Sequence, residues 1–121
     1  MTKKDVTKRL SELSLLKAGW LDGEGEVVNL VGLKTFERLF EQYYPIEFQQ
    51  PYVFPMLNGN IQLEWNMIPG VWPEMEIDLV TLQGNWLGQS HDECIIDLTV
   101  EAGWKDLVQR IGELYSRKDL K

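Results

Sequence analysis

Carboxylates are the most numerous side chains in this sequence that could carry chemistry. Glu64, Glu76, Asp78 and Asp97 lie in stretches where apolar and polar residues alternate, the pattern of half-buried β-strands. The alternation places the four acids on the side opposite to the apolar residues. We therefore expect Glu64 to lie across from Glu76 or Asp78 on a neighbouring strand. Such a cluster suits a basic partner, a cation, or the paired carboxylates of a hydrolase.

Nucleophilic catalysis has a weaker basis in the sequence. His91 is the only histidine and Cys94 the only cysteine, and they stand where a loop is expected to enter a strand. A nucleophile needs its base within hydrogen-bond reach, and strand alternation gives no reason for these two side chains to converge. Neither a P-loop nor a G-x-G-x-x-G motif is present. The sequence therefore predicts no catalytic residue, no metal site and no cofactor.

A loop over residues 19–28 carries Asp22, Glu24 and Glu26 between glycines. The spacing matches the first ligands of an EF-hand, but the turn glycine and the later bidentate glutamate are replaced by valine and leucine. We interpret this segment as a tight polar turn, with Trp20 anchoring it against the core.

Charge is distributed unevenly along the 121 residues, whose net charge is −7. Residues 1–18 carry +3, residues 19–101 carry −12 and residues 102–121 carry +2, and no lysine or arginine occurs from Leu39 to Trp104. An acidic surface repels phosphate backbones, so we predict no nucleic-acid partner. It attracts a basic protein or a cation. Alternatively, the basic terminal helices lie near the acidic sheet and offset its charge.

The elements that must position these residues are three helices and a sheet. Apolar residues at helical spacing predict helices over 3–18, 30–44 and 101–116, the second begun by Asn29 and the last capped by Thr99. Between the second and third helices, alternating stretches predict four to five strands. We expect an α+β fold in one domain, residues 1–121: an antiparallel meander with helices packed on one face, in the order ααβββββα.

Two turns of the predicted sheet are assigned from glycine-containing motifs. Asn58-Gly59 favours a two-residue type I′ hairpin between the first two strands, and Gln83-Gly84-Asn85 is interpreted as the turn before a fourth strand at 86–88. Pro51 and Pro55 indicate that the first strand is short or at a sheet edge.

The chain has no apolar run approaching the ~18 residues needed to cross a bilayer, and its start lacks the apolar segment of a signal peptide. We therefore expect no membrane partner and a cytoplasmic location. A lone cysteine fits a reducing compartment.

Three segments resemble those of a family of small uncharacterised bacterial proteins. The segments are Gly19-Trp20-Leu21-Asp22-Gly23-Glu24-Gly25, Asn58-Gly59-Asn60-Ile61-Gln62-Leu63-Glu64-Trp65 and Met75-Glu76-Ile77-Asp78-Leu79. They are similar to that family's W-D-G-x-G segment, D/N-G-x-I-x-L-E-W hairpin and acidic L-E-I-x-L strand, except that Leu21 is inserted between the tryptophan and the aspartate. The resemblance implies a bacterial stand-alone domain and supplies no catalytic residues.

A hydrophobic loop at 68–73 has two interpretations. It marks a contact surface, as exposed apolar loops often do, or Trp72 folds back over the sheet. Our hypothesis is a non-enzymatic protein-binding module. The resemblance to small bacterial proteins implies an acidic inhibitor of the immunity-protein or antitoxin type. Its acids would pair with a basic partner and Trp72 would anchor the contact. The first alternative is a protein that binds or senses a cation or small ligand, and the second is a carboxylate-dependent hydrolase. The predicted partner-binding residues are Glu64, Glu76, Asp78, Asp97 and Trp72.

Overall fold

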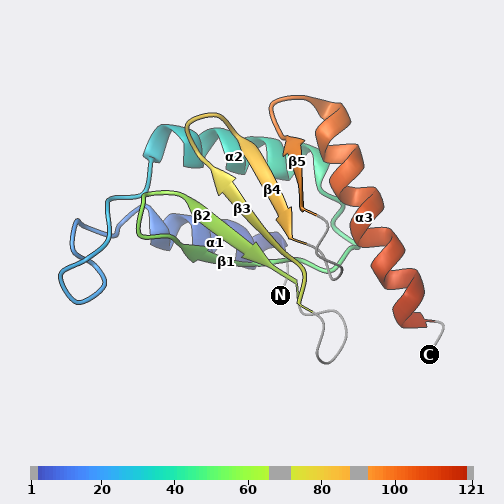
Figure 1. The fold of residues 1–121 in the computed structure, drawn as a ribbon, viewed down its shortest axis with the longest axis horizontal. Helices are drawn as coiled ribbons and strands as arrows, with labels where there is room; N and C mark the ends of the chain where they lie inside the picture. Colours follow the sequence, from blue (N-terminus) through green and yellow to red (C-terminus); the bar gives the residue numbers. More distant parts are fainter. Residues whose placement is uncertain (1–2, 66–71, 88–92, 120–121) are drawn as a thin grey trace.

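The structure is a computed structural model that describes residues 3–65, 72–87 and 93–119 (Figure 1). His91 and residues 68–71 of the hydrophobic loop lie outside the described residues. The elements, in chain order, are α1 (Lys3–Leu13), α2 (Leu30–Tyr43), β1 (Tyr52–Pro55), β2 (Ile61–Glu64), β3 (Glu74–Asp78), β4 (Gln83–Leu87), β5 (Glu93–Asp97) and α3 (Glu101–Asp119).

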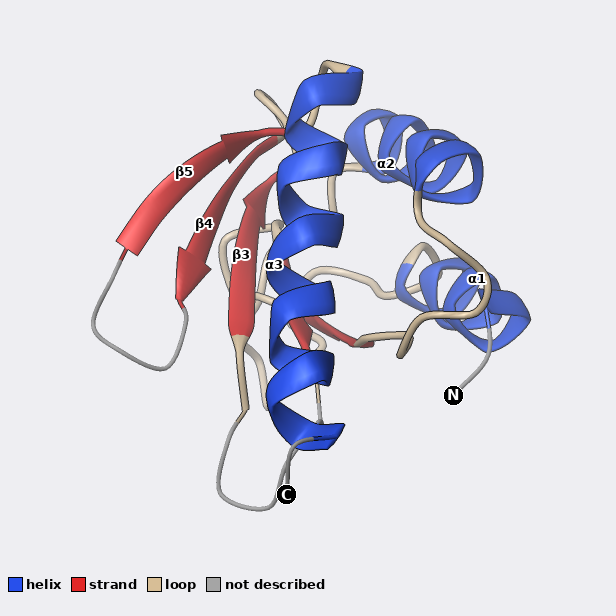
Figure 2. Cartoon of the chain, turned by 90° about the vertical axis from the view of Figure 1, so that its right-hand side faces the viewer, coloured by secondary structure: helices blue, strands red, loops and turns tan. Residues whose placement is uncertain are grey.

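The five strands form one antiparallel meander in the order β1-β2-β3-β4-β5. Strand alternation sends one set of side chains into the core and the other set outward, as the burial of successive residues in β2, β3 and β4 shows. Figure 2 shows the helices on one side of the curved sheet and no helix on the other. The predicted α+β fold and its order are confirmed, and the short β1 lies at an edge of the sheet.

The core lies between the sheet and the helices. Helical spacing places Phe36 and Phe40 of α2 and Trp104 of α3 on facing sides, and the rings of Phe36 and Trp104 have centroids 5.8 Å apart. The Trp104 indole N–H donates a hydrogen bond of 2.9 Å to the carbonyl of Leu98, at the end of the sheet. One buried aromatic cluster therefore joins α2, α3 and β5.

The N-terminal end of α3 packs on the sheet in backbone contact. A methyl group built on Gly103 would lie 1.7 Å from the carbonyl oxygen of Asp97. Only glycine allows so close an approach, since no side-chain atom can occupy that space. This contact sets how tightly α3 is drawn onto β5.

The first hairpin differs from the predicted two-residue turn. Residues 56–60 connect β1 to β2, with the Met56 amide donating to Asn60 O over 2.9 Å and the Gly59 amide donating to Met56 O over 3.1 Å. A type I′ turn needs positive φ at both central residues, but here Gly59 has φ +87° and Asn58 does not share it. The predicted turn type is wrong, although the hairpin exists and its glycine serves the turn.

The turn before β4 also differs from the prediction. Gly84 and Asn85 lie inside β4, and the turn is formed by residues 79–82. The Asp78 carboxylate accepts a 2.8 Å hydrogen bond from the Val80 amide, an Asx-type turn. A methyl on Gly84 would lie 2.7 Å from the sulfur of Met75. This glycine therefore reflects close cross-strand packing rather than a turn.

Two helix limits are corrected as well. The helix predicted over 3–18 ends at Leu13 and continues in short turns, such as the hydrogen bond from the Leu16 amide to Leu13 O. The helix predicted over 101–116 extends to Asp119, and Thr99 does not cap it because the Thr99 hydroxyl donates to Asp97 instead. Asn29 is confirmed as the cap of α2, accepting from the Gly32 amide.

Candidate functional site on the open face of the sheet

The outward side chains of the five strands form the surface that we call the open face. Figure 1 looks onto it, with α1 and α2 behind the sheet. Strand register arranges its residues in rows that cross the sheet. The open face comprises Tyr52, Phe54, Gln62, Glu64, Glu74, Glu76, Asp78, Gln83, Asn85, Leu87, Ile95 and Asp97.

Register places Glu64 directly across from Glu74, which the sequence analysis did not include, rather than from Glu76 or Asp78. The predicted partner of Glu64 is therefore wrong, by two residues along β3 for Glu76 and by four for Asp78. Burial raises the pKa of Glu74, and the hydrogen bond and negative charge of Glu64 raise it further. Partial burial and the negative charge of Glu64 thus make Glu74 easier to protonate than an ordinary glutamate.

The effect of this pair on stability is testable. A raised pKa in the folded state means that the charged form of Glu74 is disfavoured, so the cost is absent at acid pH and full above the raised pKa. We expect Glu74→Gln to raise the free energy of unfolding by about 0.3 kcal/mol near pH 7, a small value because both side chains are only partly buried and water screens the pair. The gain should vanish near pH 4.

Urea unfolding of both proteins across this pH range measures the difference. Glu76→Gln is the matched control, because register sets Glu76 between Gln62 and Asn85 instead of across from another acid. An equal gain in the two variants would show that overall negative charge, rather than the Glu64–Glu74 pair, sets the cost.

Asp78 and Asp97 each hold a turn as well as presenting charge on the open face. Asp78 caps the 79–82 turn through the amides of Val80 and Thr81. Asp97 accepts hydrogen bonds of 2.6 Å from the Thr99 hydroxyl, 3.0 Å from the Thr99 amide and 2.9 Å from the Gln83 side chain. These hydrogen bonds lower the pKa of Asp97, and the bond from the Thr99 hydroxyl has the largest effect.

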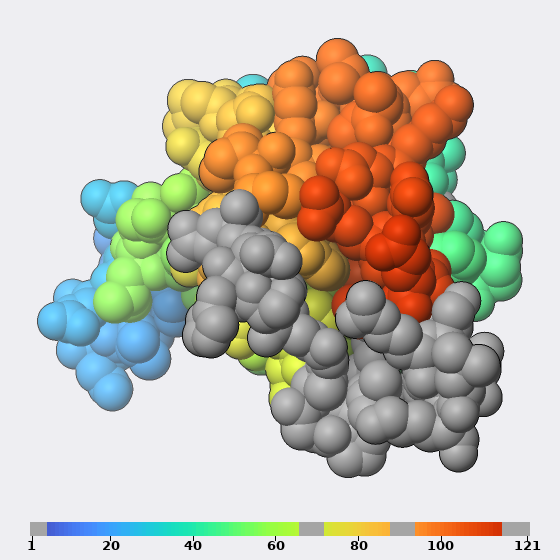
Figure 3. Space-filling view, turned by 45° about the vertical axis from the view of Figure 1, so that its right-hand side comes forward, coloured from blue at the N-terminus to red at the C-terminus, as the bar shows by residue number. Residues whose placement is uncertain are grey.

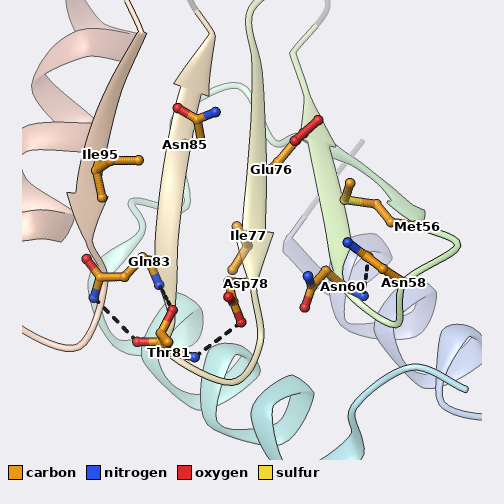
Figure 4. Close-up of a pocket in the computed structure, with 10 residues that line it drawn as sticks. All are labelled: Met56, Asn58, Asn60, Glu76, Ile77, Asp78, Thr81, Gln83, Asn85 and Ile95. Atoms are coloured by element: carbon orange, nitrogen blue, oxygen red, sulfur yellow. Dashed lines mark hydrogen bonds between the residues drawn. The ribbon is translucent and has the colours of Figure 1, made fainter. Parts of the chain in front are cut away.

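A shallow hollow of about 430 Å³ lies among these groups on the open face. In Figure 4, Glu76, Asn85 and Ile95 lie side by side on three strands, with Asp78 and Gln83 in the next row. The hollow offers carboxylate and amide groups to a ligand. Among the described residues, no three histidine, cysteine, aspartate or glutamate side chains gather closely enough to hold a metal ion.

Trp72 is described and its side chain is 50% exposed. It stands two residues before Glu74, and the hydrogen bond of 3.0 Å from the Trp65 amide to Pro73 O closes the ladder between β2 and β3 at this end. Trp72 therefore lies at the end of the sheet that carries the Glu64–Glu74 pair.

Three cations of the terminal helices form ion pairs within their own helix among the described residues. The ion pairs are Arg9–Glu12 at 3.4 Å, Lys105–Glu101 at 3.8 Å and Arg110–Asp106 at 3.0 Å. Arg9 also donates to Val53 O of β1. None of these three pairs includes a carboxylate of the open face.

The loop over residues 19–28 is tight, as predicted, but Trp20 does not join the described core. Its indole N–H donates to Glu26 O over 2.9 Å, and a methyl on Gly25 would meet the indole ring at 2.6 Å. Trp20 thus packs on its own loop, which corrects the prediction that it anchors against the core. The reason is local: the bonds between Leu21 and Glu24 close the loop on itself before it reaches the helices.

Several residues of the open face were missed by sequence reasoning. Glu74 is two residues before Glu76 in β3 and therefore lies on the same face of the sheet. The alternation of apolar and polar residues could thus have predicted that Glu74 points outward. Tyr52, Phe54 and Ile95 add exposed apolar surface beside the acids.

Comparison with models of protein families, with curated proteins and with solved structures finds no match to this chain. The resemblance described above therefore stays a prediction, and the site is interpreted from its own geometry.

On the described elements, no helix is both long and apolar enough to cross a membrane.

Proposed function

We propose that this protein is a non-enzymatic binding module that holds a basic protein partner on the open face of its sheet. The observation that carries the proposal is a helix-free sheet face that bears Glu64, Glu74 and Glu76 while residues 39–104 contain no cation. Opposite charges speed association and fix orientation, and the effect weakens in salt. Such a protein would act as an acidic inhibitor in the cytoplasm, of the immunity-protein or antitoxin type.

The structure refines which acids the proposal uses. Asp78 and Asp97 hold turns, so reversing their charge would disturb the fold as well as binding. Glu64, Glu74 and Glu76 lie within the strands on the outward side and leave the turns intact when changed. Trp72, half exposed at the same end, would supply the apolar anchor that hot spots commonly contain.

Triple reversal of Glu64, Glu74 and Glu76 to lysine is expected to weaken capture of basic proteins from native cell extract at least about tenfold at low salt. Retained proteins are quantified by mass spectrometry at low and high salt. The matched control reverses Glu12, Glu47 and Glu113, which are exposed outside the open face and give the same change in net charge.

The proposal requires that the unchanged protein captures certain basic proteins at low salt and releases them at high salt. The open-face variant must fail to capture these same proteins at low salt, and the control variant must still capture them. Equal losses in both variants would mean that net charge alone governs retention, and that the open face is no binding site. Circular dichroism of each variant verifies that the fold is retained.

A second candidate function is the binding of a small polar ligand or organic cation in the hollow of about 430 Å³ that Glu76 and Asn85 help to line. A rise in melting temperature with an added small diamine, removed by Glu76→Gln, would favour it over the protein-binding module.

A further inference from the structure

A second hollow, of about 520 Å³, lies where the 19–28 loop meets the first hairpin. We call it the apolar hollow and define it by Trp20, Leu21, Phe54, Met56, Leu57 and Gln62, which line it. Three of these apolar side chains are strongly exposed: Leu21 by 47%, Phe54 by 40% and Leu57 by 47%. Exposed apolar groups gathered from two segments mark a contact surface more strongly than single ones do.

Hydrogen bonds hold the two sides of the apolar hollow together. The Glu26 amide donates to Leu57 O over 2.8 Å, and the Asn29 amide donates to Gly59 O over 3.1 Å. The Trp20 indole is fixed by its bond to Glu26 O. Figure 3 shows the blue loop lying beside the green hairpin. The hollow is therefore formed before any partner arrives, which reduces the entropic cost of binding.

Acids lie next to residues of the apolar hollow, both along the chain and in strand register. Asp22 and Glu24 are exposed on the loop that carries Trp20, and the Glu26 side chain lies beside Gly59 of the hairpin. On the sheet side, Gln62 of the apolar hollow pairs in register with Glu76. The apolar hollow thus continues directly into the acidic open face.

We infer that the apolar hollow receives a large apolar side chain of a cationic peptide segment, whose lysine or arginine residues lie against the bordering acids. The inference rests on the proposed function and names the partner's chemistry. Charge complementarity selects this occupant: a second copy of this chain, with its net charge of −7, would bring acids against acids. An uncharged apolar segment would leave the surrounding carboxylates without partners.

Three pentapeptides test the inference by two-dimensional amide NMR at low salt. The first has four lysines around a central tryptophan, the second replaces the tryptophan by alanine, and the third replaces the lysines by glutamates. We expect the first to shift the amide signals of Leu21, Met56 and Leu57, which line the apolar hollow but lie outside the open face. It should bind about tenfold more tightly than the second, since it buries an aromatic side chain. The third should not bind.

Leu57→Ser is expected to remove most of the advantage of the tryptophan peptide, because it takes away an exposed wall of the hollow and leaves the backbone bond to Glu26 in place. Val80→Ser is the matched control, an exposed apolar residue in the turn between β3 and β4. It should leave the affinity unchanged. The amide spectrum of each variant also reports whether it is folded.

The outcomes separate this inference from the proposed function. Equal affinity for the tryptophan and alanine peptides, with shifts on the open face, would overturn the inference and leave the proposed function standing. Binding of the glutamate peptide would overturn the cationic part of the inference. If neither lysine peptide bound and reversal of the open-face acids left capture unchanged, both would fail.

Discussion

Replacing Gly103 by alanine is expected to lower the free energy of unfolding by about 3 kcal/mol. The new methyl group would lie 1.7 Å from the carbonyl oxygen of Asp97 and 2.6 Å from its carbonyl carbon. Both atoms belong to the backbone of β5, so neither can rotate away as a flexible side chain would. The helix must move off the sheet, and the contacts of Trp104 one residue later weaken with it.

Gly112→Ala is the matched control on the same helix. A methyl there would meet the ring of Phe48 at an ordinary contact distance of 3.7 Å. Alanine is a better helix former than glycine, so this variant should gain up to about 1 kcal/mol. Urea unfolding near pH 7 measures both variants. The free energy of unfolding should fall for Gly103→Ala and rise for Gly112→Ala. A similar loss in both variants would mean that α3 does not pack on β5 as described.

Trp104→Ala is expected to cost about 3–5 kcal/mol of unfolding free energy, the range for a large buried aromatic residue. The side chain is almost fully buried, contacts the rings of Phe36 and Phe40, and donates to Leu98 O. Trp104→Phe separates the two contributions. It keeps a ring but removes the donor, and leaving a buried carbonyl unpaired costs about 1–3 kcal/mol.

Trp72→Ala is the control for this series, because Trp72 is half exposed and removing it should change the free energy of unfolding by less than about 1 kcal/mol. Thermal and urea unfolding of the three variants give the ranking. Equal destabilisation by Trp72→Ala and Trp104→Ala would contradict the assignment of Trp104 to the core and of Trp72 to the surface.

Strand alternation was sufficient to predict which face each residue occupies. Ile61, Leu63 and Trp65 are fully buried, and Ile95 and Asp97 are outward, because burial of one face is a strong energetic constraint on a period of two residues. Helical spacing and the Asn29 cap likewise predicted α2 to within one residue of its C-terminal end. These elements depend on local pattern and on burial alone.

Register and turn type were not predictable in the same way. A shift of two residues along β3 keeps the same face buried, so alternation cannot distinguish Glu74 from Glu76 as the residue opposite Glu64. The hydrogen bond from the Trp65 amide to Pro73 O continues the observed register beyond the end of the two strands. Gly84 was misassigned for a related reason, since its role is a contact with Met75 on the next strand.

The acidic site was therefore predicted in its chemistry but not in its arrangement. The absence of lysine and arginine from residues 39–104 predicted a sheet without cations. The alternation of apolar and polar residues predicted which acids point outward. The apolar hollow was not predictable, because it depends on Trp20 and Leu57, residues that come together only when the 19–28 loop is bonded to the hairpin.

The meander order also has a consequence for the sequence of events during folding. Every strand pairs with its neighbour along the chain, so each pairing closes only a short loop and costs little chain entropy. The bond from Arg9 to Val53, in contrast, joins residues 44 positions apart. We expect the strands to pair early and α1 to pack on the sheet late. The newly formed sheet then passes through a stage in which the apolar side chains that α1 covers are still exposed to water.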